Sequence, residues 1–424
     1  MNWTAHAENN GVISVEMNEE HGRRYKQVIT ILSLGSFVNG LGQYIVWVIM
    51  AVYLNQARGV GYVGVGLVFL AGGLISVPAS IYGGNLLDRL GRRGIMIAIP
   101  WIMTGMFAVL YLSVTYELSV YFVEVLFIAV TPLGTMQYVA FNAIASDVTT
   151  PQERTNAFGI LRIASNAGIG AGLVLGGILS EVSYAVVFLL PTAGSLIEGI
   201  LYFARIPETS PRTIKREKNA VGEKISVPIR DTLFITVSII LGIGFFTSGM
   251  FESALTPLYL SSVDGYTNLM ITGLFAVNTL VVLVAQGPIN RIFYEYRDTT
   301  RIILGLSLFA FGFLLFAITS YYLLLVIAVI ILTWGENMSS PSASALITKM
   351  APEDRRGAYL GLNSSINSFI SPFRPLAATS ILAFSAAAPG DTWIFLSAFT
   401  LLAAGLLLAV FGISRKAMEE RKNS

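Results

Sequence analysis

The stretch that decides the fold reads Gly84-Asn-Leu-Leu-Asp-Arg-Leu-Gly-Arg-Arg93, a short charged segment between two long apolar ones. No charge occurs between Arg58 and Asp88, and none between residues 94 and 116. About 20 apolar residues in a helix cross a bilayer, whose core offers no water to satisfy an open backbone. The stretch is therefore predicted to be a tight basic loop joining two membrane-spanning helices.

The same pattern extends over the whole chain of 424 residues. Only 12% of them are charged and 54% are hydrophobic, whereas globular chains carry about 25% charged residues. The sequence therefore predicts an all-α membrane protein with twelve transmembrane helices. We place them near 28–53, 63–87, 94–114, 119–144, 157–179, 184–204, 232–258, 268–290, 302–318, 321–346, 358–385 and 392–413.

The basic residues predict the orientation of these helices. If both chain ends lie on one side, nearly all loop lysines and arginines share that side, and the other side receives only Arg58. Cytosolic loops carry the excess of basic residues in membrane proteins. We therefore expect a multi-pass protein of the cell membrane with both termini in the cytoplasm.

A charged segment with three prolines, 205–231, falls near the middle of the chain and separates two sets of six helices. The octapeptide Pro151–Phe158 is similar to Pro352–Tyr359, at an offset of 201 residues, and each copy opens the fifth helix of its set. Parallel repeats of this kind build transporters with a central site. The predicted parts are a tail 1–24, a bundle 25–204, a linker 205–231, a bundle 232–414 and a tail 415–424.

Composition also excludes several classes of function. The chain has no cysteine, and both histidines, His6 and His21, lie in the polar N-terminal tail. Thiolate or histidine metal sites and a Ser-His-Asp triad in the body are thereby excluded. No phosphate-binding G-x4-G-K-[ST] loop occurs. We expect no enzyme, no cofactor, no metal and no nucleic-acid partner, but a membrane-embedded monomer.

The opening stretch resembles the G-x-L-a-D-r-x-G-r-r signature of the major facilitator superfamily. Helix ten carries Gly335-Glu336-x4-Pro341, which, with the repeated loop, resembles the proton-coupled, drug-antiporter-like branch. The resemblance implies two pseudo-symmetric six-helix bundles and a cytosolic gate in which Asp88 meets helix eleven. The implied gating residues are Gly84, Asp88, Arg89, Gly91, Arg92, Arg93, Asp147 and Arg154. The alternative is a loop that only sets topology.

Helix five carries Gly168-x3-Gly172-Leu173-x2-Gly176-Gly177, which is similar to an exporter element. Leu173 stands where that element has proline, so the direction of transport stays open. Glycines spaced by four allow close approach of another helix, and we interpret them as packing residues. Arg162 is expected to pair with Asp147 or to extend toward the membrane surface.

Ionisable residues within lipid are costly and indicate function. Glu336 and Arg374 are predicted at depths of roughly 21 Å and roughly 15–17 Å from the outer helix ends. With Glu252 they are candidates for proton coupling, in which Glu336 alternates between ionised and protonated forms. A static Glu336–Arg374 pair and an anion contact at Arg374 are the alternatives. Glu124 and Glu198 are expected to be solvated helix ends.

Polar side chains predicted within the helices are candidates for the wall of a central cavity, although such residues also join helices. These candidates are Asn39, Gln43, Tyr44, Gln137, Asn363 and Asn367.

The sequence thus favours a secondary transporter that moves a small organic solute by alternating access, coupled to protons, with multidrug efflux as one form. Proton-coupled uptake of a sugar, organic acid or peptide is the alternative. A non-transporting receptor on the same scaffold is the rival from another class.

Overall fold

The computed structural model describes residues 4–209, 231–352 and 355–423, and this part of the chain is helical throughout apart from its connections. The first half comprises α1 (Thr4–Val52), η1 (Tyr53–Ala57), α2 (Tyr62–Leu90), α3 (Arg92–Thr115), α4 (Val120–Asp147), α5 (Pro151–Val182), α6 (Tyr184–Val187) and α7 (Leu189–Arg205). The second half comprises α8 (Thr232–Met250), η3 (Phe251–Leu255), α9 (Thr256–Ser262), α10 (Asn268–Ile292), α11 (Asp298–Ile318), α12 (Tyr322–Met350), α13 (Arg356–Ile370), η5 (Ser371–Phe373), α14 (Arg374–Phe384) and α15 (Asp391–Asn423).

Within the described residues, eleven helical segments are long and apolar enough to cross a membrane. The eleventh predicted span, 358–385, is not one continuous helix, because a 3₁₀ turn at Ser371–Phe373 separates α13 from α14. Proline lacks a backbone N–H and its ring clashes with the preceding turn, so Pro372 and Pro375 account for the break. The seventh span also differs from the expected single helix, since the π-turn η3 divides it.

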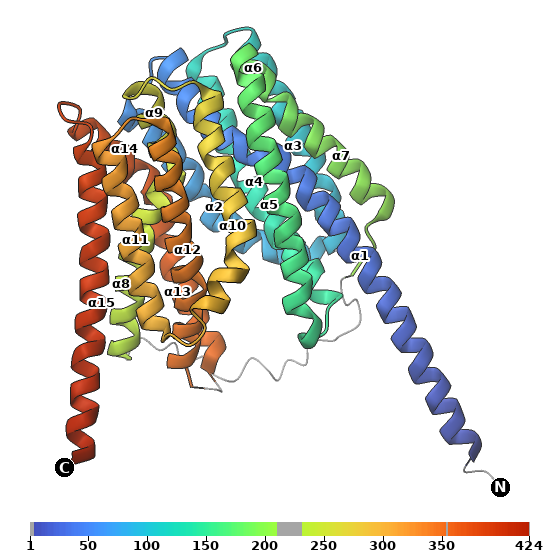
Figure 1. Ribbon diagram of the computed structural model, residues 1–424. Coiled ribbons are helices and arrows are strands. Elements are labelled where there is room, and N and C mark those ends of the chain that lie inside the picture. The colour runs from blue at the N-terminus through green and yellow to red at the C-terminus, as the bar shows by residue number, and fades with distance from the viewer. Residues whose placement is uncertain (1–3, 210–230, 353–354, 424) are drawn as a thin grey trace.

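The two halves form adjacent bundles, and the chain ends project from the same end of the molecule (Figure 1). We call this end the terminal side and the other end the opposite side. The prediction of a two-bundle, all-helical membrane fold is confirmed. Most of the predicted linker, residues 210–230, lies outside the described residues.

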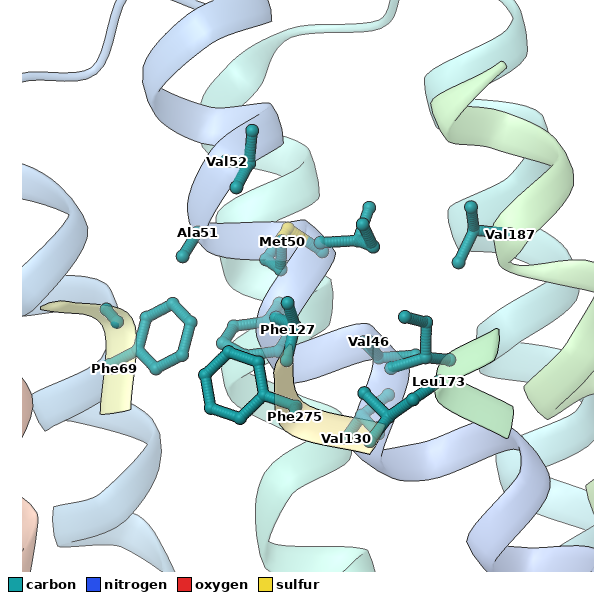
Figure 2. Packing of buried hydrophobic residues seen from close by; sticks show 14 of the residues in the cluster. Val46, Met50, Ala51, Val52, Phe69, Phe127, Val130, Leu173, Val187 and Phe275 are labelled. Carbon is teal, nitrogen blue, oxygen red and sulfur yellow. The ribbon is translucent and has the colours of Figure 1, made fainter. Parts of the chain in front are cut away.

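Helix α1 is the central element of the first bundle, and its apolar side chains interlock with those of α4, α5 and α6 (Figure 2). Its backbone packs closely against α5. An ideal Cβ on Gly168 would lie 2.1 Å from the Phe37 carbonyl oxygen, and one on Gly172 would lie 2.3 Å from that of Leu41. The packing interpretation of these glycines agrees with this geometry, because any side chain would push the two helices apart.

The bundles meet on the opposite side and separate on the terminal side. The bundles meet where α2 packs along α14 and where α5 packs along α10. The first part of α13, which lies toward the terminal side, makes no extensive contact with α2 among the described residues. The space between the bundles is therefore accessible from the terminal side.

Candidate functional site

The second bundle contributes a cavity of about 410 Å³ that brings together the three residues proposed for proton coupling. Glu252 comes from η3, Glu336 from α12 and Arg374 from the start of α14. Glu252 lies deep in the protein yet is exposed to this cavity. Sequence positions 122 residues apart thus converge on one charged wall.

Two of these charges stand at helix breaks. Ser253 follows Glu252 directly and has a non-helical backbone, with φ −84° and ψ −159°. Arg374 follows the 3₁₀ turn at Pro372. Discontinuous helices near the bilayer midplane are where transporters of this architecture hold substrates and ions, because interrupted backbone is tolerated only beside a cavity. Single π-turns are likewise frequent at functional sites.

Arg374 makes no direct ion pair with Glu336 among the described residues. Its guanidinium lies against Gly249, where an ideal Cβ would approach Nη1 to 2.6 Å, and its Nε is buried without a hydrogen-bond partner. The static Glu336–Arg374 lock considered from the sequence is therefore not formed in this conformation. Arg374 instead presents an incompletely satisfied cation to the cavity.

Arg162 on α5 is exposed to the space between the bundles, and its charge acts on Glu336. The sequence-based pairing of Arg162 with Asp147 is wrong, because Asp147 pairs with Arg92 at the end of α4. Asn278 on α10 also lies near Glu336 and donates to the Thr333 hydroxyl at 2.9 Å. The cavity charges therefore interact across the two bundles.

The first bundle supplies a second wall, which includes a buried carboxylate. Glu198 on α7 is 2% exposed; its Oε2 accepts from Asn39 Nδ2 at 3.1 Å and its Oε1 accepts from the Tyr202 hydroxyl at 2.9 Å. The expectation of a solvated helix end was wrong for Glu198. The sequence did not show that Asn39 of α1 and Gln137 of α4 lie beside it.

The remaining cavity candidates fall into two groups. Asn39 and Gln137 line the wall around Glu198, while Asn363 and Asn367 line the wall around Glu336. Tyr44 lies at the junction of the bundles beside Glu252 and Arg374. Gln43 points elsewhere: its Nε2 donates to Met103 Sδ at 3.8 Å, so it joins α1 to α3.

The gating stretch forms a network at the terminal side of the first bundle. Arg92 is ion-paired with Asp147, which also accepts from the Thr209 hydroxyl at 2.9 Å. Gly91 connects α2 to α3 with φ +83°, a conformation that other residues rarely adopt. The side chains of Asp88 and Arg89 lie outside the described residues. Gly84 lies on α2, and Arg154 is exposed on the first turn of α5.

Glu208, which the sequence did not single out, anchors this network. Its carboxylate accepts from the backbone N–H groups of Arg92 and Arg93, at 3.2 and 3.4 Å. The free N–H groups of a helix start favour such a cap. We expect Glu208→Ala to destabilise the folded state by about 1 kcal/mol, measured as a lower thermal unfolding midpoint of the purified protein. An unchanged midpoint would contradict this role, with the exposed-loop variant Glu117→Ala as the control.

Polar contacts between the bundles close the opposite side. The Ser262 hydroxyl lies 3.0 Å from both Gln56 Nε2 and Asn55 Oδ1. Glu181 at the end of α5 accepts from the Leu269 N–H at the start of α10, at 3.1 Å. These contacts join residues more than 85 positions apart in the sequence, which no local pattern could reveal.

The connection after α9 is expected to depend on pH. Burial raises the pKa of the Asp264 carboxyl to about 6, and its Oδ2 has no hydrogen-bond partner. The neutral form is thus favoured in the folded state, so stability is highest below the unfolded pKa of ~3.9 and falls as pH rises through about 6. We expect the protection of amide hydrogens in this connection, after correction for the intrinsic rise of exchange with pH, to fall over that range in the wild type and not in Asp264→Asn. A pH profile shared by both proteins would contradict this assignment.

The comparison with known protein families agrees with this geometry. The sequence pattern of the Major Facilitator Superfamily matches residues 32–304 and 296–424. The chain belongs to the Major Facilitator Superfamily. It is 24% identical to a Na(+), Li(+), K(+)/H(+) antiporter of Planococcus maritimus, over 92% of this chain and 97% of that protein.

Two further comparisons, one by sequence and one by fold, agree with a transporter. The chain is 25% identical to the class B tetracycline resistance protein of Escherichia coli, over 72% of this chain and 75% of that protein. Its fold is similar to the crystal structure of peptide transporter POT in complex with sulfate, with a TM-score of 0.72 at 15% identity, covering 92% and 94% of the two chains. The relatives and structural neighbours are transporters, and the chain is not an enzyme.

Proposed function

We propose that this superfamily member is a secondary transporter that exchanges protons for a small organic solute across the cell membrane, in the direction of efflux. The observation that carries the proposal is the gathering of Glu252, Glu336 and Arg374 on the wall of one cavity. Carboxylates in a cavity whose access alternates can take up a proton on one side and release it on the other.

The coupling we propose is electrostatic. Glu252 and Glu336 are like charges whose fields reach each other; Arg374 acts on Glu252, and Arg162 of the other bundle acts on Glu336. A closing or opening of the bundles changes the distance from Arg162 to Glu336, and so changes which protonation state is favoured. A proton bound to Glu336 weakens its attraction to Arg162 and frees the bundles to rearrange.

The cavity walls favour an amphipathic solute. On the second bundle the wall is rich in hydroxyl and amide groups, including Ser340, Ser344, Asn363 and Ser364. On the first bundle the wall contains aromatic side chains, including Tyr138 and Phe158. The likeness to the tetracycline resistance protein supports efflux of such a molecule. The alternative, uptake of a peptide, sugar or organic acid, is supported by the structural likeness to the peptide transporter.

We further propose that the terminal side is cytoplasmic and that the chain works as a monomer. Arg23, Arg24, Arg93 and Arg154 are exposed, on the N-terminal part of α1 and in the first turns of α3 and α5, and basic residues at the ends of membrane spans prefer the cytoplasm.

The proposal is tested in proteoliposomes that contain the full chain, a trapped pH indicator and an imposed pH gradient. Candidate solutes are those that raise the thermal unfolding midpoint of the purified protein. An exchanger moves protons opposite to the solute, whereas an uptake symporter moves both in one direction. A solute flux that does not change with the pH gradient would contradict proton coupling. If no solute that raises the unfolding midpoint is transported, a non-transporting receptor is favoured.

A further inference from the structure

The buried Glu198 lies outside the charged cluster that the proposed coupling uses. It sits on α7 in the first bundle, whereas Glu252, Glu336 and Arg374 line the cavity of the second bundle. Its surroundings are neutral donors: the amide of Asn39, the hydroxyl of Tyr202 and the amide of Gln137. An ionised carboxylate buried without a cation is costly, so such a group binds a proton or a cation.

Gln137 gives a second, independent sign of a ligand at this place. The side chain is 5% exposed, and its Oε1 is buried with no hydrogen-bond partner. An unsatisfied buried acceptor costs about 1–3 kcal/mol, so it calls for a donor. A proton on Glu198 removes the buried charge and makes the carboxyl a donor on the same cavity wall as this orphaned acceptor.

The elements packed around Glu198 contain few competing charges. Helix α1 has no charged residue between Lys26 and Arg58, and α3 has none between Arg93 and Glu117. Helix α4 carries only Glu124 and Asp147, near its two ends, and Asp147 is paired with Arg92. On α7 itself the titratable neighbour is Tyr202. The cation on the wall of the same cavity is Arg162 of α5, and it forms no ion pair with Glu198 among the described residues.

We propose that Glu198, with Gln137, Asn39 and Tyr202, forms a second proton-binding site, which takes its proton from water in the cavity of the first bundle and returns it there. Glu198 belongs to the wall of that cavity, which supplies the path for the proton. The inference rests on the proposed function for its role in transport, but not for the binding of the proton. Two protonation sites, one in each bundle, would allow more than one proton to move with each solute.

Infrared difference spectroscopy of the purified full chain, titrated with acid and base, tests the proposal without any solute. A protonated carboxyl shows a C=O stretch that the ionised form lacks. We expect the wild type to gain this band for Glu198 on acidification, and Glu198→Gln to lose that contribution while Glu117→Gln, in an exposed loop, keeps it. A difference spectrum of Glu198→Gln equal to that of the wild type would overturn the proposal.

Tyr202→Phe gives a second readout, which does not depend on the folding of Glu198→Gln. Removing the hydroxyl takes one donor from the ionised form, so the Glu198 band should persist to higher pH in this variant. A midpoint that does not move in Tyr202→Phe would overturn the proposed donor set. Loss of the Glu198 band with intact proton-driven flux separates this site from the function proposed above, because that function depends on Glu336.

Discussion

Replacing Glu336 with Gln is expected to reduce proton-driven transport to background while the protein stays folded. Glutamine keeps the size of the side chain and its contact with Asn278, but its amide cannot bind or release a proton as a carboxylate does. A gradient can drive the cycle only through a group whose proton affinity differs between the two states. The measurement is solute flux in proteoliposomes with and without a pH gradient.

The matched control is Glu124→Gln. Glu124 is also a partly buried carboxylate within a membrane-spanning helix, but it does not line the cavities described here. Exchange of solute for solute without a gradient should survive in Glu336→Gln, because that half-cycle needs no proton step. Gradient-driven flux at the wild-type rate in Glu336→Gln would exclude Glu336 from coupling.

Adding a single methyl group at Gly172 is expected to destabilise the protein by about 2 kcal/mol. The Cβ of alanine would lie 2.3 Å from the Leu41 carbonyl oxygen on α1, and backbone cannot yield as a flexible side chain does. Gly170, two residues away on the same helix, is the control. There a Cβ would meet Thr279 Cγ2 at 3.5 Å, an ordinary contact.

The two substitutions should therefore affect stability differently: Gly172→Ala lowers it and Gly170→Ala does not. Alanine is a better helix former than glycine by about 1 kcal/mol, so Gly170→Ala should leave stability unchanged or increase it. Thermal unfolding of both variants in the same detergent decides the matter. Equal midpoints for Gly172→Ala and Gly170→Ala would show that α1 and α5 are not held at the close distance described.

The membrane spans could be predicted from the sequence because the absence of charge is a property of continuous stretches. The fine structure of two spans could not. Pro372 and Pro375 predicted a disturbance, but whether a helix kinks or breaks depends on neighbours that accept its free carbonyls. The π-turn at Glu252 had a signal that the sequence analysis did not use: Pro257 lies four residues after Ser253, where a proline removes a backbone hydrogen bond and clashes with the Ser253 carbonyl.

Part of the candidate site could be predicted, because charged residues within membrane spans are rare and stand out in the sequence. Glu336 and Arg374 were found by their predicted depth and Glu252 as the single charge in an otherwise charge-free run, and the structure places the three in one cavity. Glu198 and Arg162 were assigned the wrong surroundings, because burial of one side chain depends on helices distant in sequence. The Asn39–Glu198 hydrogen bond joins residues 159 positions apart, and no sequence pattern on either helix predicts it.

The central claim is that the two bundles must separate on the opposite side for transport to proceed. Because the chain has no cysteine, Gln56→Cys and Ser262→Cys can be joined selectively by a short bifunctional thiol reagent. The parent side chains are in hydrogen-bond contact across the closed face. The account predicts that joining them stops solute flux and that cleaving the linker restores it; wild-type flux in the joined protein would contradict it.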